Sequence, residues 1–180
     1  MRHFFVSYHH RSSVGFLEQM RQRLNDPNVK DYGFRQVDLG ENSKYTISRS
    51  IQNRIWASSV TVVLVGDQTA GSDWVDWEIW YSLRSLKAIG PSRRAFKPKG
   101  LLAVFLPVPN PNIPERLKQN LESGYALSME WNELESDFYP RLEQAFDNRE
   151  KKQLIRNELP PKINPQETWG RIESWLGLSF

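Results

Sequence analysis

The chain has 180 residues, the usual size of one compact domain, and it is long enough to bury a sizeable hydrophobic core. It contains no cysteine, which excludes disulfide bonds, thiolate metal ligands and cysteine nucleophiles, and which is typical of a cytoplasmic protein. The net charge of +3 does not by itself indicate a binding partner, and the scattered Lys and Arg residues favour solvated faces over a nucleic-acid-binding patch.

The N-terminus predicts a strand, a loop and a helix. Residues 3–8 are short, aromatic and β-branched, as expected of a buried first strand. After a polar loop, apolar residues recur at helical spacing from Val14 to Leu24, with Ser12 or Ser13 as the expected N-cap. This helix is expected to end near residues 25–27.

The next segment predicts a second strand and a second helix. Residues 33–37 form a weak strand pattern, and the polar residues 38–44 favour a surface loop. The face of the following helix is marked by Ile47, Ile51 and Ile55.

The clearest strand spans residues 60–65, whose sequence is VTVVLV. A continuous apolar strand between helices is what a parallel sheet covered on both faces requires. The following helix is expected to be capped by residues 71–73 and to reach about Leu86, because Val75, Ile79 and Leu83 recur on one face.

The second half of the chain predicts two more strands and a helical end. Residues 100–106 form a fourth strand, and the Pro-rich segment up to Ile113 favours an extended connection. Residues 125–131 are a candidate edge strand, and amphipathic patterns predict helices from Phe138 toward residue 156 and over residues 166–176. We therefore expect an α/β fold with a mostly parallel sheet of about five strands.

Glu78 is the candidate catalytic residue. On a helix beginning at residue 73, residues three and four apart share a face, so Glu78 lies beside Trp74 and Tyr81. Burial against such rings would raise the pKa of the carboxyl and a nearby cation would lower it, and the sequence leaves both open. Asp38 and Glu41 are candidates to pair with Glu78 as two neighbouring carboxylates. The alternative is a glutamate at the rim of a partly exposed helix.

A second polar cluster follows the first strand. Ser7, Tyr8, His9, His10 and Arg11 lie at its carboxyl end, where open α/β sheets bind ligands. The alternative is that the histidines are ordinary polar loop residues. We predict no metal site, because the chain has three histidines and no carboxylate is spaced to join them. There is also no Walker-type, GxGxxG or GxSxG motif.

Three segments together resemble one family. They are residues 4–10 (FFVSYHH), 60–69 (VTVVLVGDQT) and 72–79 (SDWVDWEI). In this order they look like the prokaryotic TIR-like proteins of the Thoeris anti-phage defence system, over about the first 106 residues. The resemblance implies a three-layer flavodoxin-like or TIR-like fold with helices on both faces of the sheet. We expect one domain over residues 1–180, with a core to about 131 and a helical extension from about 132.

The resemblance also implies an activity. In this family the glutamate of a Trp-x-x-x-Glu segment, here Trp74 and Glu78, catalyses a reaction that consumes NAD. The bond between nicotinamide and ribose breaks, and the product is a cyclic ADP-ribose isomer or a related ADP-ribose signal. A carboxylate near the anomeric carbon would stabilise the oxocarbenium character that develops there. NAD is the substrate, and no cofactor is implied.

The same resemblance suggests roles for the remaining candidates. Aromatic rings would stack on nicotinamide or adenine, and polar groups would hydrogen-bond ribose or phosphate. The predicted substrate-binding residues are Phe5, Ser7, Tyr8, His9, Arg11, Asp38 and Trp74.

The implied partners are NAD and a downstream effector that a diffusible nucleotide signal activates. A phage protein as trigger and assembly into a homo-oligomer are further expectations. No segment approaches the roughly 20 apolar residues of a membrane span, so we expect no membrane contact. The alternative function is a non-catalytic TIR-like interaction module. An enzyme needs Glu78 in a cleft near Tyr8 and His9, whereas a module tolerates it on a flat exposed face.

Overall fold

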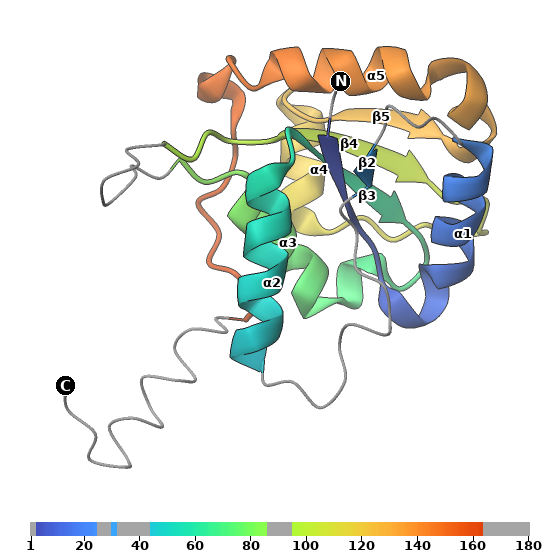
Figure 1. The fold of residues 1–180 in the computed structure, drawn as a ribbon, viewed down its shortest axis with the longest axis horizontal. Coiled ribbons are helices and arrows are strands. Elements are labelled where there is room, and N and C mark those ends of the chain that lie inside the picture. Colours follow the sequence, from blue (N-terminus) through green and yellow to red (C-terminus); the bar gives the residue numbers. More distant parts are fainter. Residues whose placement is uncertain (1–2, 25–29, 32–43, 86–94, 164–180) are drawn as a thin grey trace.

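The structure, a computed structural model, describes residues 3–24, 30–31, 44–85 and 95–163. Five strands form one sheet in the order β2-β1-β3-β4-β5, and every neighbouring pair is parallel (Figure 1). The strands are β1 (His3–Ser7), β2 (Lys30–Asp31), β3 (Val60–Val65), β4 (Gly100–Phe105) and β5 (Leu127–Glu130).

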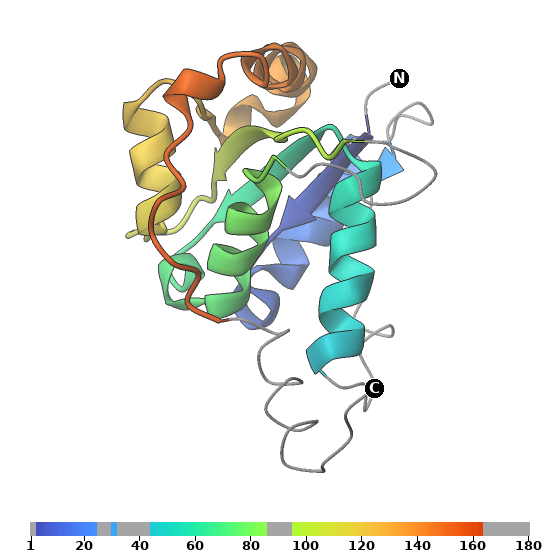
Figure 2. The ribbon, with the colours of Figure 1, turned by 90° about the vertical axis from the view of Figure 1, so that its left-hand side faces the viewer.

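The central strand β3 explains the layered arrangement. All six of its residues are buried, because each face of the sheet is covered by helices. Helices α1 (His10–Arg23) and α5 (Leu134–Asn148) pack on the face that carries Val62 and Leu64. The opposite face carries Val63 and Val65 and is covered mainly by α3 (Asp73–Ser82) and α4 (Glu115–Glu122), with α2 (Lys44–Ala57) beside them over β1. The predicted three-layer α/β fold is confirmed (Figure 2).

Several helix boundaries differ from the prediction, among them that of α5, which ends at Asn148 instead of continuing toward residue 156. Helix α1 begins at His10, three or four residues early, and its N-cap is His9 rather than Ser12 or Ser13. Ser13 lies inside the helix and is buried. Helix α3 begins where expected, with the Val75 N–H donating to Ser72 Oγ, but it ends at Ser82 because the carbonyl of that residue accepts the backbone N–H of Lys99.

Helix α4 was not predicted. The Pro-rich connection has no regular structure up to Pro114, but it bends at residues 107–110 rather than staying extended, and α4 begins directly after it. Its buried residues are Arg116, Leu117 and Asn120, of which two are polar. Leu117 and Leu121, four residues apart, form the apolar face of α4, so the sequence carries a helical pattern here that the prediction missed.

After α5 the chain contains the short 3-10 helix η4 (Lys152–Leu154) and then runs without regular structure to residue 163. We call residues 155–163 the C-terminal strap. Figure 2 shows this orange-red segment passing down between α4 and α3. The predicted second strand at 33–37, the loop containing Asp38 and the predicted helix at 166–176 lie outside the described residues.

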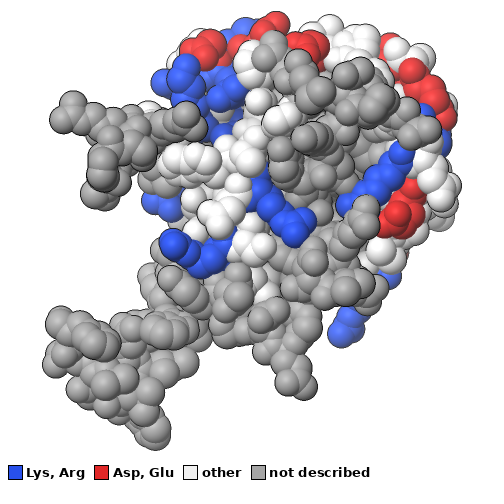
Figure 3. Space-filling view, viewed as in Figure 1, with Lys and Arg blue, Asp and Glu red and all other residues white. Residues whose placement is uncertain are grey.

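Charged side chains of both signs occur over α5, at the top of the face in Figure 3. Among the residues that the structure describes, two cations depart from the expectation of solvated faces, since Lys99 and Arg116 are both buried. Burial lowers the pKa of Lys99 to about 8. None of the helices in the described ranges is both long and apolar enough to cross a membrane.

Candidate functional site

A pocket of about 360 Å³ lies at the carboxyl end of β1. Residues from the β1 end and the start of α1 form one wall, while α2 and the first turns of α3 form the others. The lining residues are Phe5, Val6, Tyr8, His9, His10, Arg11, Ile47, Ile51, Ser72, Trp74 and Glu78.

Glu78 is the carboxylate of this pocket. It belongs to α3, whose N-terminal turn is fixed by the Ser72 cap, and only 8% of its surface is exposed. Desolvation raises the pKa of Glu78 to about 8, although a hydrogen bond from Ser7 opposes the shift. Burial therefore dominates, and the carboxyl of the free protein is mostly protonated at pH 7.

Ser7 hydrogen-bonds Glu78 from the end of β1. It is the last residue of β1 and is fully buried, on the same face of the strand as Phe5. The Ser7 hydroxyl donates to Glu78 Oε2 over 2.5 Å. A donor to the carboxylate favours its ionised form, so this bond keeps the pKa from rising further.

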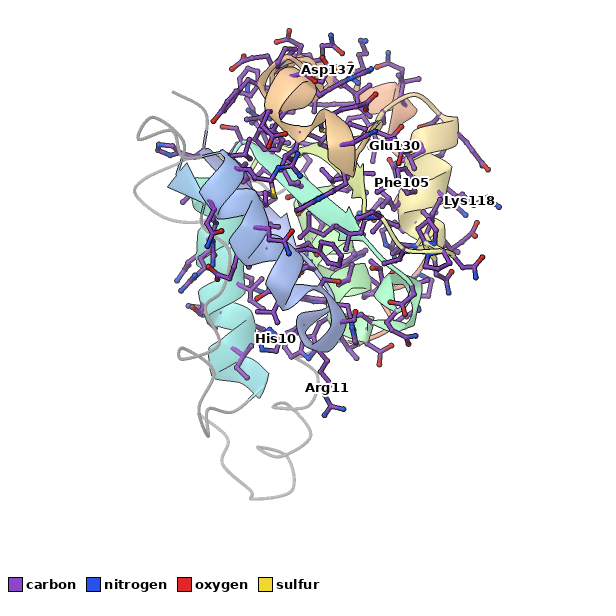
Figure 4. The ribbon with its side chains drawn as sticks, turned by 90° about the vertical axis from the view of Figure 1, so that its right-hand side faces the viewer. His10, Arg11, Phe105, Lys118, Glu130 and Asp137 are labelled. Carbon is purple, nitrogen blue, oxygen red and sulfur yellow. The ribbon has the colours of Figure 1, made fainter. Side chains whose placement is uncertain are left out.

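The polar edge of the pocket comes from the residues that follow β1. His9 Nδ1 lies 2.8 Å from Ser12 Oγ, and the Tyr8 hydroxyl lies 3.3 Å from His10 Nδ1. Figure 4 shows Arg11 at the start of α1, with its side chain directed away from the body of the protein. These groups therefore lie where the pocket meets solvent.

The apolar walls come from three elements. Phe5 is buried in β1, and Ile47 and Ile51 project from α2. Trp74 on α3 contacts Trp77 edge-on, with ring centroids 5.7 Å apart. Because Trp77 is almost completely buried, it fixes the half-buried Trp74 ring beside the pocket.

One family model matches residues 5–107 of the chain and describes the TIR-like domain of the Thoeris protein ThsB. The match covers 103 of the 180 residues, which is more than half. The chain belongs to this family. This confirms the resemblance and gives the protein a TIR-domain role in defence. The matched segment of this Thoeris TIR-like protein includes every lining residue of the pocket.

Among solved structures, the chain is similar to the TIR domains in the structure of the activated Roq1 resistosome directly recognizing the pathogen effector XopQ. The sequence identity is 14% and the TM-score is 0.43, and the alignment covers 98% of this chain and 99% of that chain.

The structure of the Thoeris TIR-like protein brings most of the predicted site residues together. Six of them line the pocket, and Ser7 lies beneath it and contacts Glu78 rather than the open space. Asp38 lies outside the described residues. The six lining residues are Phe5, Tyr8, His9, Arg11, Trp74 and Glu78.

Sequence reasoning missed part of the pocket wall. Ile47 and Ile51 had been recognised as one face of a helix, but not as neighbours of the site. The order of the elements offers a signal for them, because a helix that leads into a strand of a parallel sheet packs on a face of that sheet. In the structure this helix, α2, packs on β1 and α3. Among the residues that the structure describes, no group of three side chains could hold a metal ion.

Proposed function

We propose that this protein is a TIR-domain enzyme that cleaves the nicotinamide–ribose bond of NAD, with Glu78 as the catalytic residue. Its product is a cyclic ADP-ribose isomer or a related ADP-ribose signal, which activates an effector in anti-phage defence. The observation that carries the proposal is a buried carboxylate in an aromatic pocket, on the Trp-x-x-x-Glu segment of a Thoeris TIR-like domain.

The pocket suits the positively charged nicotinamide ring of NAD. Phe5, Tyr8 and Trp74 provide aromatic surface for the rings of NAD, and a cation held over such a face is attracted to it. The same positive charge next to Glu78 would lower the pKa of the carboxyl, because an opposite charge favours the ionised form. Substrate binding would thereby convert the protonated carboxyl of the free protein into the carboxylate that the reaction needs.

Bond cleavage follows from this arrangement. When the bond from C1′ of the ribose to nicotinamide breaks, its electron pair leaves with the nicotinamide, which becomes neutral. The ribose develops oxocarbenium character, and the Glu78 carboxylate stabilises that positive charge. A hydroxyl group within the same ADP-ribose then attacks C1′ and loses its proton, which gives a cyclic product.

The apolar walls of the pocket influence whether water or an internal hydroxyl attacks C1′. Water attacking C1′ would give open ADP-ribose, whereas an internal hydroxyl gives the cyclic isomer. Ile47 and Ile51 limit the room for ordered water beside Glu78, which favours internal attack. At the solvent edge, His9, His10 and Arg11 are suited to the diphosphate of the substrate.

The alternative of a non-catalytic interaction module has less support. That function does not require a carboxylate in a pocket, and it tolerates Glu78 on a flat face. The 8% exposure of Glu78 and the residues around it favour the enzyme.

The test is to incubate the purified protein with NAD and to analyse the products by liquid chromatography and mass spectrometry. Lysate from phage-infected cells is added in a second series to supply a trigger. Glu78→Gln should abolish both NAD loss and the cyclic product, while Glu122→Gln on exposed α4 surface should leave both unchanged. Equal NAD consumption by the parent and the Glu78→Gln variant would falsify the catalytic role.

A further inference from the structure

Helix α3 has the pocket on one face, and α4 and the C-terminal strap on another. Trp74 and Glu78, four residues apart, share the face that lines the pocket. Asp76 and Trp80 are also four residues apart and lie about 200° around the helix from the other pair, at about 100° per residue. This second face is bound by α4 and by the C-terminal strap.

A buried ion pair joins α3 to α4. Arg116 Nε donates to Asp76 Oδ1 over 3.3 Å, and the two side chains are 1% and 8% exposed. The other ends of the guanidinium fork bind the strap. Its Nη1 donates to Asn157 Oδ1 over 2.8 Å and its Nη2 to the Pro160 carbonyl over 3.0 Å. One side chain of α4 therefore connects α3 with the strap.

The strap also binds α3 directly. The backbone N–H of Lys162 donates to Asp76 Oδ2 over 2.9 Å, so both oxygens of that carboxylate are occupied. One turn later, Asn157 Nδ2 donates to the Trp80 carbonyl over 3.1 Å. The strap is itself tied to α4, because the Asn120 side chain bonds both the carbonyl and the N–H of Arg156.

We propose that Asp76, Arg116 and the strap are positioning residues for Glu78: they hold α3 so that Glu78 and Trp74 face the pocket and water is kept from the carboxyl. The inference rests on the proposed function of Glu78. Arg116 and the strap lie beyond residue 107, where the match to the family model ends. The contacts that support the site on this side therefore come from a part of the chain that the family model does not include.

The burial of Glu78 offers a readout for this role. If α3 shifts or loosens, water reaches the carboxyl and its pKa falls from about 8 toward 4.5. Besides Glu78, the titratable or charged groups that line the pocket are Tyr8, His9, His10 and Arg11, all from the β1–α1 region. Helix α2 contributes only the apolar side chains of Ile47 and Ile51 to this lining. The proposed variants leave all of these in place, and an Asp76 carboxylate left without Arg116 would raise the pKa of Glu78, so a lowered midpoint would report a change in the position of α3.

The experiment compares the parent protein with Arg116→Met and Asn157→Ala. Because Arg116→Met leaves the charge of a buried carboxylate uncompensated and is therefore strongly destabilising, Asp76→Asn/Arg116→Met is included to remove both charges. The control is Arg23→Met, which breaks a more exposed guanidinium pair, with Glu135, between α1 and α5 on the opposite face of the sheet.

Two measurements are made on each folded variant. The first is the titration midpoint of the Glu78 carboxyl by NMR of ¹³C-labelled glutamate, assigned as the signal that Glu78→Gln lacks. The second is kcat and KM for NAD. We expect the midpoint to fall by about one unit or more in Arg116→Met or in the double variant, and by less in Asn157→Ala. We expect kcat to fall about tenfold or more, and Arg23→Met to match the parent.

The outcomes separate this inference from the proposed function. A Glu78 midpoint that stays at the parental value in folded Arg116→Met or in the double variant would overturn the positioning role. A shift in Arg23→Met of the same size would also overturn it, because the effect would then be general. A lowered midpoint in variants of a parent that consumes no NAD would refute the proposed function and leave the role in holding Glu78 standing.

Discussion

Replacing Glu78 with Gln should make the protein more stable at high pH. The folded protein holds the Glu78 proton up to about pH 8, whereas an unfolded chain releases it near 4.5. Between these values the folded state binds more protons, so raising the pH favours unfolding. Gln is close in shape, it can accept the Ser7 hydrogen bond, and it carries no ionisable proton.

The size of the effect follows from the two pKa values. A difference of about 3.5 units corresponds to about 5 kcal/mol above pH 8, at about 1.4 kcal/mol per unit. Between pH 5 and pH 8, ionisation of Glu78 should cost the parent on the order of 3 to 4 kcal/mol of unfolding free energy. Over that range the Glu78→Gln variant should gain the same amount relative to the parent, or roughly 10 °C in Tm.

The assay is urea unfolding at pH 5, 6, 7 and 8, followed by tryptophan fluorescence. Because the difference between parent and variant is measured at each pH, contributions from groups other than Glu78 cancel. Glu122→Gln, on the exposed surface of α4, should stay parallel to the parent. If the curves of Glu78→Gln and the parent also stay parallel from pH 5 to pH 8, the carboxyl is not desolvated and the argument is wrong.

Three further substitutions test other parts of the structure. Ser7→Ala removes the donor that favours ionised Glu78, so the pH of half-maximal kcat/KM for NAD should rise by about one unit, and an unmoved pH profile would contradict this role. Trp74→Ala removes aromatic surface worth about 1–3 kcal/mol of NAD binding, so KM for NAD should rise roughly 10- to 100-fold in steady-state assays. Trp56→Ala, at a 42% exposed site away from the pocket, should leave KM unchanged. Gly100→Ala would place a Cβ 2.0 Å from a backbone oxygen of α5, so urea unfolding should show a loss of about 2–3 kcal/mol, and parental stability would show that α5 can move aside.

The parts of the fold that follow from local pattern were predictable. The run at 60–65 and the strand from Gly100 are continuous and apolar because helices cover both faces of a parallel sheet. Helix α4 was missed because its apolar pattern is short, with Leu117 and Leu121 at helical spacing in an eight-residue helix that also buries the polar Arg116 and Asn120. Their burial depends on partners about 40 residues away, which no local window contains.

The candidate site also consists of residues that local pattern predicts and of contacts that only the folded chain shows. Helical spacing places Trp74 and Glu78 on one face, and parallel topology places the end of β1 near them. The direction of the Glu78 pKa shift could not be predicted, because it depends on how completely α2 and β1 exclude water. The bond from Ser7 to Glu78 joins residues 71 positions apart, so it too follows only from the folded chain.

The contacts between the strap and α3 can form only after the strap has been synthesised. Asn157 and Lys162 leave the ribosome after every strand and helix described above, so a growing chain carries Glu78 before it carries the strap. If NAD consumption depends on that support, unfinished chains are harmless to the NAD of the cell. Any consumption of NAD would then be confined to chains that already contain the strap.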